Sequence, residues 1–184
     1  MPDIFNEKQL EDSLRQEFEQ TIKSRVQRYL SVKPHGIIPN AKFAVASSEC
    51  SLLFRDGHFY GCIALSQAVA EALVKYLCEK NRWVPANNYE ENVHALHKRG
   101  FISEQLRDRL LQIWQERDTY HHLNNSIATE IDKLEQIAQE KAKLIALIEA
   151  EVFSFTADRD GRLIPRNPKY WDGNKGEVYL RLDR

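Results

Sequence analysis

Apolar residues recur at helical spacing through most of this chain, and this periodicity limits the fold more than any other feature. Near the N-terminus six large apolar residues follow one another at four-residue steps, with charged residues between them: Leu10, Leu14, Phe18, Ile22, Val26 and Leu30. Such spacing is typical of an apolar stripe along a helix. The sequence therefore predicts a long first helix from about Asp3 to Ser31.

Residues 32–43 interrupt this helical pattern. The stretch contains Pro34, Gly36 and Pro39, and each of them opposes the continuation of a helix. We expect a linker here, and it is a candidate domain boundary between the first helix and the rest of the chain.

Residues 44–153 have the apolar spacing that is typical of a helical bundle. A first helix should end at Gly57, which can take the left-handed conformation that closes helices. Ser103 and Ser126 are suitable N-caps for two later helices, the second reaching Phe153. The apolar spacing predicts a core formed by Leu65, Val69, Leu73, Leu110, Ile113, Ile131 and Leu134.

Beyond Phe153 the pattern changes. Asp-Gly pairs at 160–161 and 172–173 indicate turns, and the segment 177–183 alternates with period two. Residues 154–184 are therefore predicted to form a small β-hairpin tail. The fold class expected for the whole chain is all-α, an antiparallel bundle with a long N-terminal helix and this tail.

The composition limits the cellular compartment and the binding partners expected for the chain. The 26 Lys and Arg nearly cancel the 27 Asp and Glu, so any contact with RNA must be local. Three widely spaced cysteines favour a reducing compartment over a disulfide framework or a thiolate zinc site. The charged N-terminus and the lack of a long apolar run predict a soluble cytoplasmic protein without a membrane partner.

The residues best suited to chemistry lie in the segment 116–125. On an ideal helix Arg117 and His121 share a face, whereas His122 points away. An imidazole can move protons at a 2′-hydroxyl while a guanidinium stabilises phosphate charge, so such a pair could cut RNA without a metal. The spacing alone is also typical of a solvated helix end, and by itself it favours that interpretation.

His94 and His97 form a second candidate pair, one helical turn apart. Surface residues are favoured there over metal ligands.

The same segment resembles the signature of the HEPN superfamily, in which an Arg and a polar residue precede a His by a few positions. Arg117-Asp118 followed by His122 matches this pattern, and the resemblance extends over residues 44–153. It implies a helical bundle that pairs two-fold and acts as a metal-independent endoribonuclease. Arg117 and His122 would then be catalytic, and Asp118 would orient them.

Three further residues are auxiliary candidates. His121 adjoins the signature, and Asn124 stands where related toxins often carry a tyrosine. Glu71 lies within the apolar central helix, where a buried carboxylate would need a partner such as Arg117 or a histidine.

The leading expectation is a HEPN-type endoribonuclease, the toxin of a toxin–antitoxin pair or a phage-defence component. Its partners would be RNA as substrate, a second copy of the chain and an antitoxin protein, with neither cofactor nor metal. The alternative is a non-catalytic helical module that binds a protein or a nucleotide through the same groove.

Overall fold

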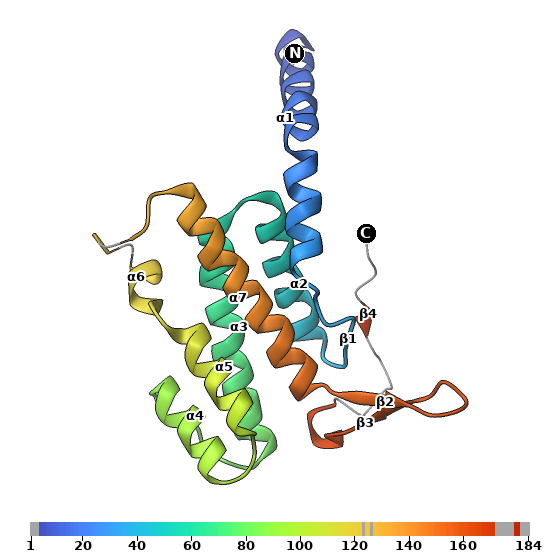
Figure 1. Cartoon of the computed structure of the whole chain (residues 1–184), viewed down its shortest axis with the longest axis vertical. Coiled ribbons are helices and arrows are strands. Elements are labelled where there is room, and N and C mark those ends of the chain that lie inside the picture. Colours follow the sequence, from blue (N-terminus) through green and yellow to red (C-terminus); the bar gives the residue numbers. More distant parts are fainter. Residues whose placement is uncertain (1–3, 123, 126, 172–178, 181–184) are drawn as a thin grey trace.

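The computed structural model describes residues 4–122, 124–125, 127–171 and 179–180, and these form a mostly helical protein (Figure 1). The helices are α1 (Ile4–Ser31), α2 (Ala41–Asp56), α3 (Phe59–Lys80), α4 (Tyr89–Lys98), α5 (Glu104–Trp114), α6 (Arg117–His121) and α7 (Ile131–Val152). The short elements are β1 (Ile37–Ile38), β2 (Phe155–Ala157), β3 (Leu163–Pro165), the 3₁₀ helix η1 (Pro168–Tyr170) and β4 (Tyr179–Leu180). A helical bundle of five or more helices was expected, and it is confirmed.

Helix α3 is the centre of the bundle and packs most extensively against α2 and α7. Among its buried residues, Val69 and Leu73 lie in the main core cluster together with Leu110 and Ile113 of α5, as predicted. Leu65 is half-buried against the same cluster. By length and composition α3 could also cross a membrane, and its central place in the bundle accounts for that apolar character.

The helix boundaries follow capping residues that the sequence contains. Gly57 closes α2 with a φ of 87°, and Ser103 Oγ accepts a hydrogen bond from the Leu106 N–H at 3.0 Å, as expected for an N-cap. Asn40 caps α2, so this helix begins at Ala41 rather than Ala44. The preceding segment contains β1, and its Ile38 is fully buried in the main core cluster.

The final long helix begins later than the sequence predicted. Helix α7 starts at Ile131, and the expected cap Ser126 lies outside the described residues. Because Ile131 is the first helical residue, its side chain is 68% exposed, and the prediction that it belongs to the core is wrong. Leu134, one turn later, is buried as predicted.

This difference predicts unequal effects of two alanine substitutions on α7. Leu134→Ala should lower the free energy of unfolding by about 2–3 kcal/mol, because it leaves a cavity in the second core cluster. Ile131→Ala should change it by less than about 0.5 kcal/mol, since little apolar surface is lost. Urea denaturation of the two variants measures the difference, and equal effects would contradict this assignment.

The all-α class needs one correction, because the chain contains two short antiparallel strand pairs. Strands β2 and β3 form the expected tail hairpin, with the turn at Asp160-Gly161. Strand β4 does not extend that hairpin but pairs with β1, matching Ile37 with Leu180. The expected turn at 172–173 lies outside the described residues.

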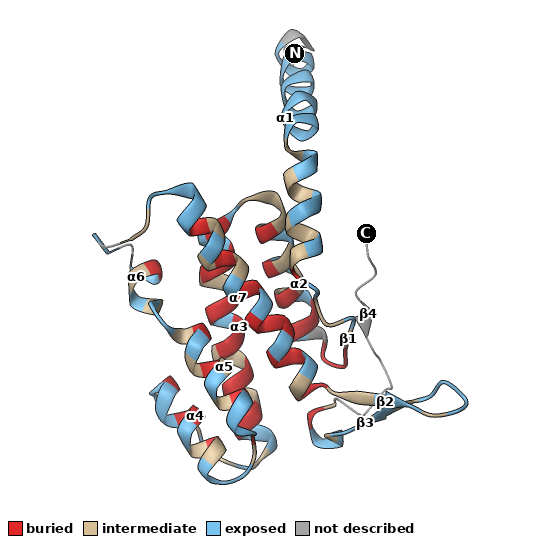
Figure 2. Ribbon diagram, viewed as in Figure 1, coloured by how far each residue is buried: buried red, intermediate tan, exposed pale blue. Residues whose placement is uncertain are grey.

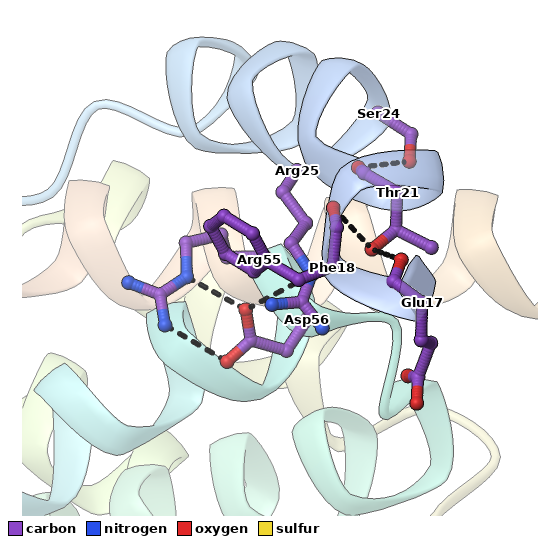
Figure 3. Close-up of polar contacts among 7 residues, drawn as sticks. All are labelled: Glu17, Phe18, Thr21, Ser24, Arg25, Arg55 and Asp56. Carbon is purple, nitrogen blue, oxygen red and sulfur yellow. Dashed lines mark hydrogen bonds and ion pairs between the residues drawn. The ribbon is translucent and has the colours of Figure 1, made fainter. Parts of the chain in front are cut away.

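Helix α1 is predicted to within one residue, but its surroundings are unusual. Its C-terminal part packs on α2, whereas its N-terminal part projects beyond the bundle (Figures 1 and 2). At the junction Arg25 Nε lies 3.8 Å from Asp56 Oδ1, which also accepts from Arg55 (Figure 3). Arg28 forms a two-pronged contact with Glu135 of α7, at 3.0 and 3.1 Å.

Candidate active site

The signature residues lie in and directly after a single short helix at one end of the bundle. Helix α5 stops at Trp114, and α6 starts anew at Arg117 after a sharp break. At this break Glu116 has a φ of 59°, a left-handed conformation that L-residues seldom adopt. The sequence suggested one continuous helix here, so the break is a finding of the structure.

Two buried side chains hold the chain at this break. Lys141 Nζ donates to the carbonyl oxygens of Gln112, Ile113 and Gln115 at 3.3, 2.8 and 2.9 Å. Gln67 Nε2 donates to the carbonyls of Ile113 and Gln115 at 3.2 and 3.1 Å. These donors satisfy carbonyls that lose their helical partners where α5 ends. The orientation of α6 therefore depends on α3 and α7.

Lys141 is an uncommon residue for a core, since its side chain is only 5% exposed. Burial lowers its pKa from the usual 10.5 to about 8, so the ammonium group still predominates at neutral pH. A positive charge at the C-terminal end of α5 also complements the negative end of the helix dipole. The three accepting carbonyls match the three N–H donors of an ammonium.

Arg117 is positioned by an aromatic stack. Its guanidinium lies 5.0 Å from the centre of the Trp114 ring, and Trp114 stacks on Tyr89 at 3.9 Å. The Tyr89 hydroxyl donates to the Leu110 carbonyl at 3.0 Å, which fixes the stack against α5. Arg117 Nη1 donates to Asp118 Oδ1 at 3.1 Å, so the predicted orienting residue does contact the arginine. The Arg117 side chain keeps about a third of its surface exposed.

The two histidines differ in their surroundings. His121 is exposed, and its pKa is lowered by partial desolvation and then by the charges of Arg117 and His122, while Glu71 and the backbone of Ala64 on α3 oppose this shift. The structure thus brings Glu71, Arg117 and His121 into one electrostatic neighbourhood. His122 follows the last helical residue, and its side chain is exposed.

Asn124 closes the C-terminal end of α6. Its Nδ2 donates to the Asp118 carbonyl at 3.3 Å, and its backbone N–H donates to the Thr119 carbonyl at 3.1 Å. This auxiliary candidate therefore has a structural role next to the signature.

A pocket of about 160 Å³ opens beside Arg117. Its walls come from α3, α4, the segment before α4 and the α5–α6 break, and they include Glu71, Lys75, Asn87, Tyr89, Trp114 and Arg117. Lys75 Nζ lies 2.7 Å from Glu71 Oε1, so the auxiliary candidate Glu71 is paired within α3. The mixed aromatic and charged lining is suited to a polar, planar ligand.

Sequence reasoning missed Lys141 and Gln67. The signal for Lys141 was present, because it shares the apolar face of α7 with Ala138, Ala142 and Ile145 at helical spacing. A lysine on such a face must find acceptors, but the pattern does not show which carbonyls it reaches.

The described residues contain no group of three or more His, Cys, Asp or Glu side chains that could hold a metal ion. His97 Nδ1 lies 3.5 Å from a nitrogen of Arg107, and His94 is exposed on the same helix.

No protein-family model matches this chain, and neither the curated proteins nor the solved structures include a significant match.

Proposed function

We propose that this chain is a metal-independent endoribonuclease whose active site is α6. The observation that carries the proposal is the placement of Arg117, Asp118, His121 and His122 in and directly after α6, a short helix at the surface that buried donors hold at the end of the bundle. The resemblance of the segment 117–122 to the HEPN signature supports the same function.

The proposed reaction is transfer of the RNA phosphate from its 5′-oxygen to the neighbouring 2′-oxygen. A histidine takes the proton of the 2′-hydroxyl, the 2′-oxygen bonds to phosphorus, and the bond to the 5′-oxygen breaks. The leaving oxygen receives a proton from an imidazolium, which returns to the neutral form, so the products are a 2′,3′-cyclic phosphate and a free 5′-hydroxyl. Arg117 binds the phosphate and stabilises the charge that grows on it.

We assign proton transfer to His122 and the orientation of Arg117 to Asp118. His122 is exposed and free to meet a substrate, and the Arg117–Asp118 contact of 3.1 Å supports the second role. His121 is the competing base, since it shares the face of Arg117 and desolvation lowers its pKa, which favours the neutral form that accepts a proton. A two-fold homodimer with two α6 helices facing each other would place both signatures on one phosphate.

A second candidate function is a non-catalytic module that binds a nucleotide. The pocket beside Arg117 favours it, because Trp114 and Tyr89 offer aromatic surface and Lys75 adds a cation. In either case an antitoxin protein could cover the same end of the bundle, in a toxin–antitoxin or phage-defence setting.

Incubation of the purified chain with a mixed-sequence RNA tests the proposal. We expect cleavage that persists in excess EDTA, with products that carry a 2′,3′-cyclic phosphate detectable by mass spectrometry. The control is a variant with alanine at both Arg117 and His122, prepared in parallel to reveal contaminating nucleases. Cleavage that the chelator abolishes, or that the double variant retains, would contradict the proposal and favour the binding module.

A further inference from the structure

The N-terminal part of α1 has no packing partner within the described chain. Every residue from 6 to 20 is exposed, and this part projects away from the bundle (Figure 2). At 1.5 Å per residue the projecting residues 4–20 extend for about 25 Å. Helices in proteins gain most of their stability from tertiary packing, and an isolated helical segment of this length is marginally stable in water. The projection therefore calls for a contact outside this chain.

The six apolar residues of α1 lie on solvent-facing surface rather than in the core. Leu10, Leu14, Phe18, Ile22, Val26 and Leu30 have exposed fractions from 37% to 68%. The side of α1 that meets the bundle carries charged residues instead. Arg25 lies against Asp56 (Figure 3), and Arg28 contacts Glu135. A continuous exposed apolar stripe on a soluble protein marks an interaction surface.

The charges of α1 are divided between its two halves. Residues 4–19 contain five acidic and two basic residues, whereas residues 20–31 contain three basic and no acidic ones. Two of the three, Arg25 and Arg28, contact Asp56 and Glu135, but Arg55 adds another cation at the same junction. The surface around the second half thus stays net positive, and the first half is complementary to it.

We propose that α1 pairs in antiparallel orientation with α1 of a second copy of this chain. That orientation sets the acidic half of each helix against the basic half of its partner, whereas a parallel pair would oppose like charges. A pair symmetric about residue 20 joins Leu10 with Leu30, Leu14 with Val26, and Phe18 with Ile22. The stripe repeats every four residues, a longer period than the helical turn, so it drifts around α1 in a right-handed sense, and its central residues from Leu14 to Val26 lie closest to the partner helix.

This interface is separate from the proposed active site. Helix α1 projects from one side of the bundle and α6 lies well away from it (Figure 1). The inference does not depend on nuclease activity, and its tests use association rather than cleavage as the readout.

Cross-linking between two single variants tests the pairing and its direction. An equal mixture of the Leu14→Cys and Val26→Cys proteins should give a mixed dimer with a short bismaleimide. The three native cysteines are buried, so the wild-type chain serves as the unreactive control. Cross-linking of Leu14→Cys to itself in preference to the mixed pair would overturn the antiparallel arrangement. The lack of any cross-linked dimer would overturn the pairing.

Light scattering on a stripe variant tests the role of the apolar residues. Leu10→Lys/Leu14→Lys should raise the dissociation constant of this pair by at least about tenfold and halve the mass measured at micromolar concentration. The matched control, Gln9→Lys/Gln16→Lys, adds the same charge on the opposite side of the exposed helix and should leave the mass unchanged. A wild-type monomer, or equal masses for the two variants, would overturn the proposal. RNA cleavage by the stripe variant should persist, which separates this test from that of the active site.

Discussion

Replacement of His122 with alanine should lower the rate of RNA cleavage by about 10²–10⁴-fold, the usual contribution of a positioned acid–base group. Because His122 is exposed, the substitution should not change the free energy of unfolding by more than about 0.5 kcal/mol. The matched control is His121→Ala, which removes the neighbouring imidazole. Single-turnover cleavage rates decide between them. A larger loss with His121→Ala would move the proton-transfer role to the histidine that shares the face of Arg117.

Substitution of Arg117 should lower the cleavage rate almost as much as substitution of His122. Arg117→Ala should cost roughly 10²–10³-fold in rate, since it removes the cation that stabilises charge on the phosphate. Arg117→Lys keeps the charge but loses the forked geometry with which a guanidinium can bind a phosphate, and it loses the contact with the Trp114 ring, so its rate should lie between those of alanine and arginine. Equal rates for all three side chains would remove Arg117 from the mechanism.

Lys141→Ala should lower the free energy of unfolding by about 3–5 kcal/mol. The substitution removes a buried stem and leaves the carbonyls at the end of α5 short of donors. Lys143→Ala, two residues along the same helix but exposed, is the matched control and should have little effect. Chemical denaturation gives the energies. Amide exchange at Tyr120 and His122 should also accelerate in the folded Lys141→Ala protein, because α6 loses its support.

The effect of Lys141→Ala on the free energy of unfolding should depend on pH. The folded-state pKa of Lys141 lies below its unfolded value, so the unfolded chain binds more protons between about pH 8 and 10.5. The stability that this group contributes therefore rises with pH through that window and is lost as pH falls toward 8. The advantage of the wild-type chain over Lys141→Ala should widen by about 1–2 kcal/mol between pH 8 and 9.5. An unchanged difference would contradict a lowered pKa of Lys141 in the folded protein.

Much of the helical fold could be predicted from local signals. Gly57 closes α2, Ser103 caps α5, and Val69 and Leu73 lie in the core, because each of these features depends on residues close in sequence. The stripe of α1 shows the limit of such reasoning. Its spacing predicted the helix correctly, but spacing does not show what a stripe contacts, and here the bundle meets the polar side.

The candidate site was predicted less completely than the fold. The signature residues are close in sequence, so their gathering on α6 could be anticipated. The break before Arg117 depends on hydrogen bonds from Lys141 and Gln67, which lie on helices distant in sequence. The pocket likewise combines Glu71, Tyr89 and Trp114 from separate helices. Contacts of this kind follow from tertiary packing and leave little trace in a local pattern.

The pairing of β1 with β4 has a consequence for the order in which the molecule folds. Ile38 lies opposite Tyr179, so the two strands join segments that are about 140 residues apart in the sequence. During synthesis β1 waits without its partner until residues 179–180 emerge, long after α2 and α3 are available to pack. Contacts between residues so distant in sequence form slowly, because the long loop between them must first close. The helical bundle should thus assemble first on the ribosome, with the strand pair as its last closure.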